Sequence, residues 1–410
     1  MIRINRFLCF MLSILILLVA FPNLYWADGD GSGETDVDRE MRQYYEDQMQ
    51  KPDYATVKAK VLDIPYDDTQ VAKKDTPRVS DIRYQHLELV ITSGKHKGEV
   101  FTVKNQIEMI NPYKLIVKKG ETILLRLYED SDGKVENLVV YERSKDIYIY
   151  GFIILFILLL VLIGGMKGLK AALTLGITAV MVVFVLFPLI LRGWNPVITS
   201  SLVCIVITGI SLYLVSGRNK KTLNAFLGTI GGVLVAGALA LIVGHLCKLT
   251  GLGDEDAQLL AFVPQYMNLD FKGLLFAGII IGSLGAVMDV TMSVASAMWE
   301  IILIQPSIEA KKLIRSGMNI GKDTMGTMAN TLILAYAGGS IQTMLLLMAF
   351  KVSMFEIVNM DIIASEIVRA IAGSIGLICA IPLTALLGGI LLTKANKDKP
   401  VKTKAKKAVS

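Results

Sequence analysis

The chain has 410 residues, of which 53% are hydrophobic and 19% are charged, and its formal net charge is +6. Soluble globular domains carry about a quarter charged residues, and here the apolar residues gather in runs longer than a soluble core needs. The composition therefore excludes a wholly soluble enzyme, a disordered chain and a fibrous protein. The 4 cysteines all lie in or beside apolar runs, which predicts neither a disulfide framework nor a thiolate metal site.

Residues 1–27 predict a signal peptide or an uncleaved signal-anchor helix. Arg3 and Arg6 precede an apolar run over residues 7–21, which is the charge pattern of a secretory signal. Tyr25 fits the small-residue requirement of a cleavage site poorly, and this favours the anchor. Residues 28–54 are polar and acidic, and we interpret them as a linker.

Residues 55–146 predict a small extracytoplasmic β-rich domain. Residues 56–62 alternate apolar and polar side chains, as a half-buried strand does. Five or six short strands in this length are typical of an OB-like barrel or a sandwich. Two pairs of similar segments predict hairpins: 86–92 with 98–103, and 118–127 with 135–141.

Residues 147–393 predict a bundle of seven transmembrane helices. Each apolar segment has at least about 17 residues, enough to cross roughly 30 Å of hydrocarbon. The fold class is therefore a polytopic α-helical membrane protein with an N-terminal signal or anchor helix and a small outer all-β domain. The seven segments centre on 148–164, 171–191, 196–215, 223–247, 273–297, 326–350 and 362–392.

The loops between these segments predict the orientation. Lysine and arginine gather after the first, third, fifth and seventh segments, and the alternate loops carry acidic residues such as Asp254 and Glu356. The basic side is therefore cytoplasmic, which places the β-rich domain on the outer side of the cell membrane. The lysine-rich tail, residues 394–410, is interpreted as a solvated topogenic segment, so we expect a lipid bilayer as partner and no nucleic acid.

The fifth predicted segment carries a stripe of small and polar residues. Spacings of three and four keep the stripe on one helical face, which we expect to face protein because glycines let another helix approach closely. An aspartate there is tolerated if it is protonated, paired or hydrated. We favour a functional role for it, with a helix-packing hydrogen bond as the alternative. The stripe consists of Gly278, Gly282, Gly285, Asp289, Ser293, Ser296 and Glu300.

The sixth predicted segment has a polar face of its own, made of Asp323, Thr327 and Asn330. Asn330 is expected at a depth similar to that of Asp289. Asp323 is expected either near the cytoplasmic mouth of a site or as the cap of a helix that begins there. Further along, Gly338 and Gly339 precede a serine, and this step either breaks the helix or allows close packing; we favour packing.

The fourth and seventh predicted segments have structural features. Gly228, Gly232 and Gly244 belong to a four-residue repeat of small residues, which is typical of helix packing. Glu366 and Arg369 lie three residues apart and predict an ion pair near the outer surface.

Several motifs of known chemistry are absent from the sequence. It has no phosphate-binding loop, no His-Glu-x-x-His zinc helix and no Gly-x-Ser-x-Gly nucleophile elbow. The 3 histidines are scattered, which makes a histidine-based triad implausible. We therefore expect no catalytic residues, no metal site and no cofactor.

The polar segments resemble those of the YibE/F family of bacterial multi-pass membrane proteins. The resemblance is carried by the stretches 282–296 and 321–339, and by Glu366-x-x-Arg369 with its following glycines and Pro382. It covers about residues 145–395, with the outer β-rich domain as the usual companion. The family has no settled biochemical activity, so the resemblance implies the topology and singles out Asp289, Asp323 and Asn330 without supplying a substrate.

Three functions remain open on the sequence. The first is a secondary permease or exporter of an unknown small solute or ion, in which Asp289 handles a proton or cation. Asn330, Thr327 and Ser293 would line the same site, with Asp323 near its mouth. The second is a non-transporting scaffold or envelope sensor with an envelope or membrane protein partner. The third is an intramembrane enzyme that uses two aspartates.

Overall fold

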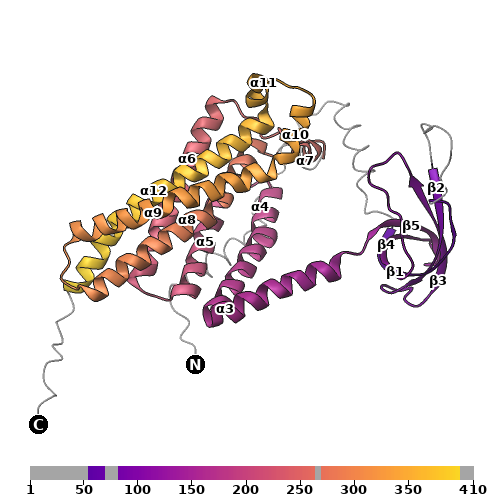
Figure 1. Ribbon diagram of the computed structural model, residues 1–410, viewed down its shortest axis with the longest axis horizontal. Helices are drawn as coiled ribbons and strands as arrows, with labels where there is room; N and C mark the ends of the chain where they lie inside the picture. The colour runs from indigo at the N-terminus through magenta and orange to yellow at the C-terminus, as the bar shows by residue number, and fades with distance from the viewer. Residues whose placement is uncertain (1–53, 70–81, 264–268, 398–410) are drawn as a thin grey trace, which may run out of the picture. The chain divides into compact units, whose positions relative to one another are not determined.

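The computed structural model describes residues 54–69, 82–263 and 269–397, with only the backbone from 394 to 397. The predicted signal or anchor, the linker up to residue 53 and the tail from residue 398 lie outside the described residues. The chain forms two compact units that divide between Leu159 and Leu160, and each is described by itself. Figure 1 colours the elements in chain order.

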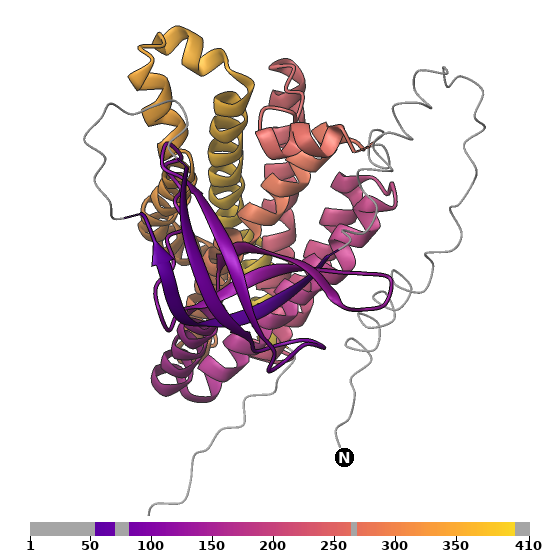
Figure 2. The same cartoon turned by 90° about the vertical axis from the view of Figure 1, so that its right-hand side faces the viewer.

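The first unit is a near-closed antiparallel β-barrel (Figure 2). The strand order is β3-β2-β1-β4-β5, so the first strand lies at the centre of the sheet. Two register shifts interrupt its pairing with β2, and such bulges bend a strand enough to curl the sheet. Of the two predicted alternatives, the barrel forms. The strands are β1 (Tyr54–Asp67), β2 (Ile82–Ile91), β3 (Val100–Glu108), β4 (Thr122–Glu129) and β5 (Val135–Arg143).

The barrel interior contains a layer of apolar side chains and three buried polar side chains, those of Arg83, Gln85 and Asn105. Leu87 and Leu125 are fully buried, as expected for alternate positions on strands with one inward face. Gln85 is also fully buried. Its Nε2 donates to the Val117 carbonyl at 3.0 Å, and its Oε1 accepts from the Val117 N–H at 2.9 Å. Gln85 therefore fixes the long connection between β3 and β4 across the barrel.

The second unit begins within a helical hairpin. The helix α3 (Asp146–Met181) is interrupted at Gly165, whose φ of 54° and ψ of −135° are not helical. The backbone folds back there so far that Gly168 packs directly on the Leu160 carbonyl. The hairpin continues through the π-helical η2 (Val182–Leu186) into α4 (Phe187–Leu191). The stretch Asp146–Leu191 thus holds two of the seven predicted membrane segments.

The remaining helices match the other five predicted segments. Within the described ranges, five stretches are long and apolar enough to span a membrane, or six with one bent pair. The stretch Asp146–Leu191 counts as one of them and covers two of the seven predicted segments, so the structure supports five or six candidate spans where seven were expected. The helices are α5 (Pro196–Ser216), α6 (Lys220–Leu246), α7 (Glu255–Ala261), α8 (Phe271–Ile304), α9 (Ala310–Gly339), α10 (Ile341–Ala349), α11 (Met354–Asn359) and α12 (Asp361–Lys397).

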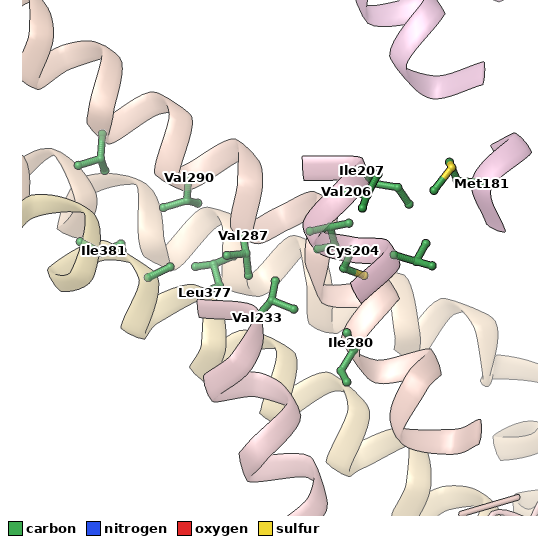
Figure 3. Packing of buried hydrophobic residues seen from close by; sticks show 14 of the residues in the cluster. Met181, Cys204, Val206, Ile207, Val233, Ile280, Val287, Val290, Leu377 and Ile381 are labelled. Atoms are coloured by element: carbon green, nitrogen blue, oxygen red, sulfur yellow. The ribbon is translucent and has the colours of Figure 1, made fainter. Parts of the chain in front are cut away.

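The core of the helical unit lies where α6, α8 and α12 meet, and Figure 3 shows part of it. Val233 of α6, Val287 of α8 and Leu377 of α12 contribute to one buried apolar cluster. The α6 and α12 backbones approach closely, because a Cβ atom placed on Gly376 would lie 2.7 Å from the Gly232 carbonyl oxygen. Only glycine permits so close a crossing, and this crossing positions α8 beside α6 and α12.

Candidate functional site

The predicted stripe of α8 lies on the surface of this chain. Gly278, Gly285, Asp289 and Ser293 are exposed, whereas Val290, one residue from Asp289, is fully buried. A Cβ atom on Gly278 or Gly285 would have no other atom within 4 Å among the described residues. The structure therefore differs from the expectation that these glycines pack against another helix of the chain. The reason is that α6 and α12 occupy the opposite side of α8.

The helix α9 begins earlier than expected. Its N-cap is Glu309, so Asp323 lies well inside the helix and the capping alternative for it is wrong. Asp323, Thr327 and Asn330 are all exposed. Asp323 has no hydrogen bond or ion pair in the part of the chain that the structure describes. These residues form the outer face of α9, opposite the side that packs on α12.

The contacts between α8 and α9 set their relative register. Near one end, Gly317 of α9 contacts Met298, with 2.6 Å between its ideal Cβ position and the sulfur atom. Near the other end, the Tyr336 hydroxyl covers Gly282. The two helices are therefore antiparallel, and interpolation places Asp289 level with about Thr327. At about 1.5 Å per residue, Asn330 is only about 4–5 Å further along the helix axis.

The exposed hydroxyls on these faces are satisfied by their own helices. Ser293 Oγ donates to the Asp289 carbonyl at 2.8 Å, and Thr327 Oγ1 donates to the Thr324 carbonyl at 2.9 Å. The Asp289 carboxylate and the Asn330 side-chain amide have no hydrogen-bond partner among the described residues. Together with Asp323, they are therefore the polar groups on these faces whose hydrogen-bonding capacity is unused among the described residues.

An unpaired carboxylate is costly at this position. Asp289 lies near the middle of α8, 15 residues before Ile304, which is about 22 Å along the axis. An aspartate at the centre of a membrane helix costs about 2.5–3.5 kcal/mol on the insertion scale. Such groups face a partner or a water-filled cavity and mark ion or substrate paths. Asp289 is accordingly the leading candidate for a functional group.

The other predicted glycines fall into two classes. Gly228, Gly232 and Gly244 of α6 are buried against α12 or α8, with the Phe276 ring 2.5 Å from the ideal Cβ position of Gly244. The ideal Cβ positions of Gly338 and Gly339 have no other atom within 4 Å among the described residues. The helices α9 and α10 meet there at a 55° bend. The Gly-Gly-Ser step therefore breaks the helix, and the close packing that we favoured does not occur.

A second polar group lies between α9 and α12. Arg369 Nη1 contacts Glu366 Oε1 at 2.7 Å, and the guanidinium lies 5.9 Å from the Tyr336 ring centre. Tyr336 and Glu366 line an open groove of about 450 Å³ whose other walls are mainly apolar side chains. Both charged residues belong to α12, and they neutralise each other. Because the Arg369 guanidinium also reaches the Tyr336 ring of α9, the pair is suited to holding the bent end of α9 against α12.

The barrel carries a feature that the sequence did not indicate. On its outer surface, the Arg126 guanidinium lies 4.0 Å from the Tyr141 ring centre and 4.7 Å from that of Tyr54. Arginine and tyrosine are enriched at recognition sites. The alternation of apolar and polar residues in β4 indicates that Arg126 faces outward. It does not indicate which residues of β1 and β5 lie beside Arg126, because this depends on how the three strands pair.

The structure gives no indication of a metal centre in the residues it describes. No three His, Cys, Asp or Glu side chains lie close enough together to share an ion there. His245 is exposed at the end of α6.

Two family models match the chain and together extend over both units. Residues 152–394 match the model of a YibE/F-like protein, and residues 53–140 match the YibE/F family N-terminal domain. The chain belongs to the YibE/F family. The first match contains α8 and α9 with all five candidate site residues. No curated protein and no solved structure matches this YibE/F protein.

Membership and the apolar helices together establish a YibE/F membrane protein with a barrel unit followed by a helical unit. The apolar helices of the helical unit are consistent with contact with a lipid bilayer.

Proposed function

We propose that this YibE/F protein is a secondary permease in which Asp289 takes up and releases a proton, or binds a cation, during each transport cycle. The observation that carries the proposal is a carboxylate near the middle of a membrane helix with no partner in its own described chain. Ser293, Thr327 and Asn330 line the same site. Asp323 lies toward the predicted cytoplasmic end.

The geometry supports a site that can be loaded and emptied. The carboxylate is exposed on the surface of the helical unit, so an ion or proton can reach it without opening the α6–α12 core. The hydroxyls around it bond to backbone carbonyls, and their oxygens retain lone pairs that can coordinate a cation. The predicted orientation, with the barrel outside, remains part of this proposal.

The enzyme alternative is less well supported by the geometry. An aspartate dyad requires two carboxylates about 3 Å apart. The register places Asp289 level with about Thr327, four residues or about 6 Å along the axis from Asp323. The scaffold alternative has one specific observation in its favour, the half-buried arginine–tyrosine stack on the outer surface of the barrel with its exposed Tyr141, which is suited to binding an envelope partner.

Carbodiimide labelling of the purified protein across pH, followed by peptide mapping, tests the proposal. The reagent modifies protonated carboxyl groups in apolar surroundings. We expect labelling of Asp289 that decreases as the pH rises, and no labelling of that peptide in Asp289→Asn. Asp323→Asn is the matched control and leaves the Asp289 signal intact. Absence of labelling at every pH indicates a permanently paired carboxylate and supports the scaffold.

A flux measurement completes the test. In proteoliposomes that contain a pH-sensitive dye, imposed gradients of candidate cations are expected to move protons with the wild type and not with Asp289→Asn. If Asp289→Asn supports the same coupled flux as the wild type, the coupling role is wrong.

A further inference from the structure

We propose that two copies of this chain associate in the membrane through the exposed face of α8 and α9, and that the partner copy completes the Asp289 site. The α8–α9 face is defined by six exposed residues: Gly285, Asp289, Ser293, Gly326, Thr327 and Asn330. The inference concerns the same site as the proposed function, but it does not require transport, because a scaffold would need the face covered as well.

The first argument is that lipid cannot satisfy this face. Hydrocarbon offers no hydrogen bonds, so polar groups at membrane depth require a protein partner or a water-filled cavity. The hydroxyls are satisfied by their own helices. The Asp289 carboxylate and the Asn330 amide are left without partners among the described residues, and both lie on the outside of the unit.

The second argument is that the face is shaped for a close helix contact. Gly285 lies one turn from Asp289 on α8, and Gly326 lies beside Thr327 on α9, at about the level of Asp289. Neither glycine has any other atom within 4 Å of its ideal Cβ position. Glycines that are buried elsewhere in this unit mark helix crossings. On the α8–α9 face, the two exposed glycines leave open depressions beside the unpaired polar groups, and such depressions let a second membrane helix approach closely.

The third argument identifies the occupant as a second copy. A two-fold axis along the membrane normal keeps every residue at its own depth and makes the contact self-complementary. Pairing across such an axis requires a donor and an acceptor at one level. Asp289 supplies only acceptors, Asn330 supplies two N–H donors, and the register places them within about 4–5 Å of one level. Each Asn330 amide can therefore donate to the Asp289 carboxylate of the partner.

Among the residues that the structure describes, the chain itself offers one other occupant, its apolar segment 147–159. That segment is rich in Ile, Leu and Phe, and its hydrogen-bonding side chains are two tyrosines near one end. It has no amide to donate to a carboxylate near the middle of α8. This occupant is accordingly an outcome of the test and not the proposal.

The mass of the full-length protein in nanodiscs or mild detergent tests the inference, measured by native mass spectrometry over a dilution series. We expect a dimer for the wild type and a dissociation constant at least about tenfold higher for Gly285→Leu, whose side chain fills the depression. Gly176→Leu is the matched control, since Gly176 is another exposed helical glycine with nothing within 4 Å. We expect it to dimerise like the wild type.

Cross-linking in native membranes provides an independent measurement. In a background in which the four cysteines are replaced by alanine, Ser293→Cys is expected to give a dimer with a short bismaleimide. Leu234→Cys, at an exposed position of α6, is expected to give none. A wild type that is monomeric at every concentration overturns the inference. So does a dimer that Gly285→Leu leaves intact, or, in a second variant that carries both Ser293→Cys and Ile154→Cys, a cross-link between these two positions within one chain.

The two proposals fail separately. A dimer in which Asp289 never reacts with carbodiimide upholds the interface and refutes the permease. A monomer in which Asp289 labelling depends on pH supports the permease and refutes the interface.

Discussion

The crossing of α6 and α12 makes Gly232→Ala the most sharply defined perturbation of the helical unit. A Cβ atom at Gly232 would lie 2.6 Å from the Ala380 Cβ, 2.8 Å from a Val287 methyl group and 2.9 Å from the Gly376 carbonyl oxygen. Carbon atoms in contact are normally about 3.5–4.0 Å apart. The added methyl group therefore overlaps two other helices, and neither an alanine Cβ nor a carbonyl oxygen can rotate away.

Relief of this overlap requires α6 and α12 to separate by roughly 1 Å along their contact. Overpacking of a well-packed core costs about 1–3 kcal/mol, and three simultaneous contacts place Gly232→Ala in the upper half of that range. For a unit of this size, such a loss lowers the melting temperature by roughly 5–10 °C. Gly176→Ala is the matched control, because Gly176 is helical and has open space around it.

Tryptophan fluorescence during thermal unfolding of the detergent-solubilised protein measures the effect, since Trp194 and Trp299 both pack against the core of the helical unit. We expect Gly176→Ala to melt at or slightly above the wild-type temperature, because alanine is the better helix former by up to about 1 kcal/mol. If Gly232→Ala also melts at the wild-type temperature, the two backbones do not cross as closely as described, and the reasoning about α6 and α12 is wrong.

Further predictions concern polar groups in both units. Burial alone would raise the pKa of Asp67, but hydrogen bonds from Thr69 and Gln85 lower it, so its stabilising contribution is complete above the usual aspartate pKa of about 4 and is lost as the pH falls further. The wild-type barrel should therefore become progressively more susceptible to limited pepsin digestion below about pH 4. The substitution Asp67→Asn should remove that component of the acid sensitivity. Gln85→Leu leaves the Val117 N–H and carbonyl unpaired and should cost about 2–4 kcal/mol, seen as faster hydrogen exchange in β2. Arg369→Met leaves a carboxylate unpaired and should lower thermal stability by more than its combination with Glu366→Gln does, as measured by the same fluorescence melt.

The strands and apolar helices could be predicted because their signals are local. The turn between β4 and β5 is an example: the segment from Asp130 ends at Gly133, whose φ of +74° suits glycine. Alternation fixes which side chains of a strand face inward, and length alone identifies an apolar helix that can span a membrane. The closure of the barrel could not be predicted in this way, because it depends on bulges in β1 that no short sequence motif indicates.

The candidate site could be predicted only in part. Spacing placed Asp289 and Ser293 on one face of α8, and the structure agrees, but spacing does not say whether that face points inward. Small residues suit a packed helix and an open surface equally well. The start of α9 was missed because a hydropathy criterion rejects the charged stretch Ala310–Lys322, although alanine, lysine, leucine and arginine are good helix formers.

The helix α8 has 34 residues without a break, which is about 51 Å of continuous rod. A hydrocarbon layer is about 30 Å thick, so an upright α8 projects roughly 20 Å into water in total, and a tilted one projects less. Asp289 and Glu300 are eleven residues apart, close to three full turns, and therefore share one azimuth. Any axial rotation that turned the aspartate toward or away from its partner would swing Glu300 through the same angle. A spin label at position 300 would thus report, from the solvent-accessible end of the rod, a movement that takes place inside the bilayer.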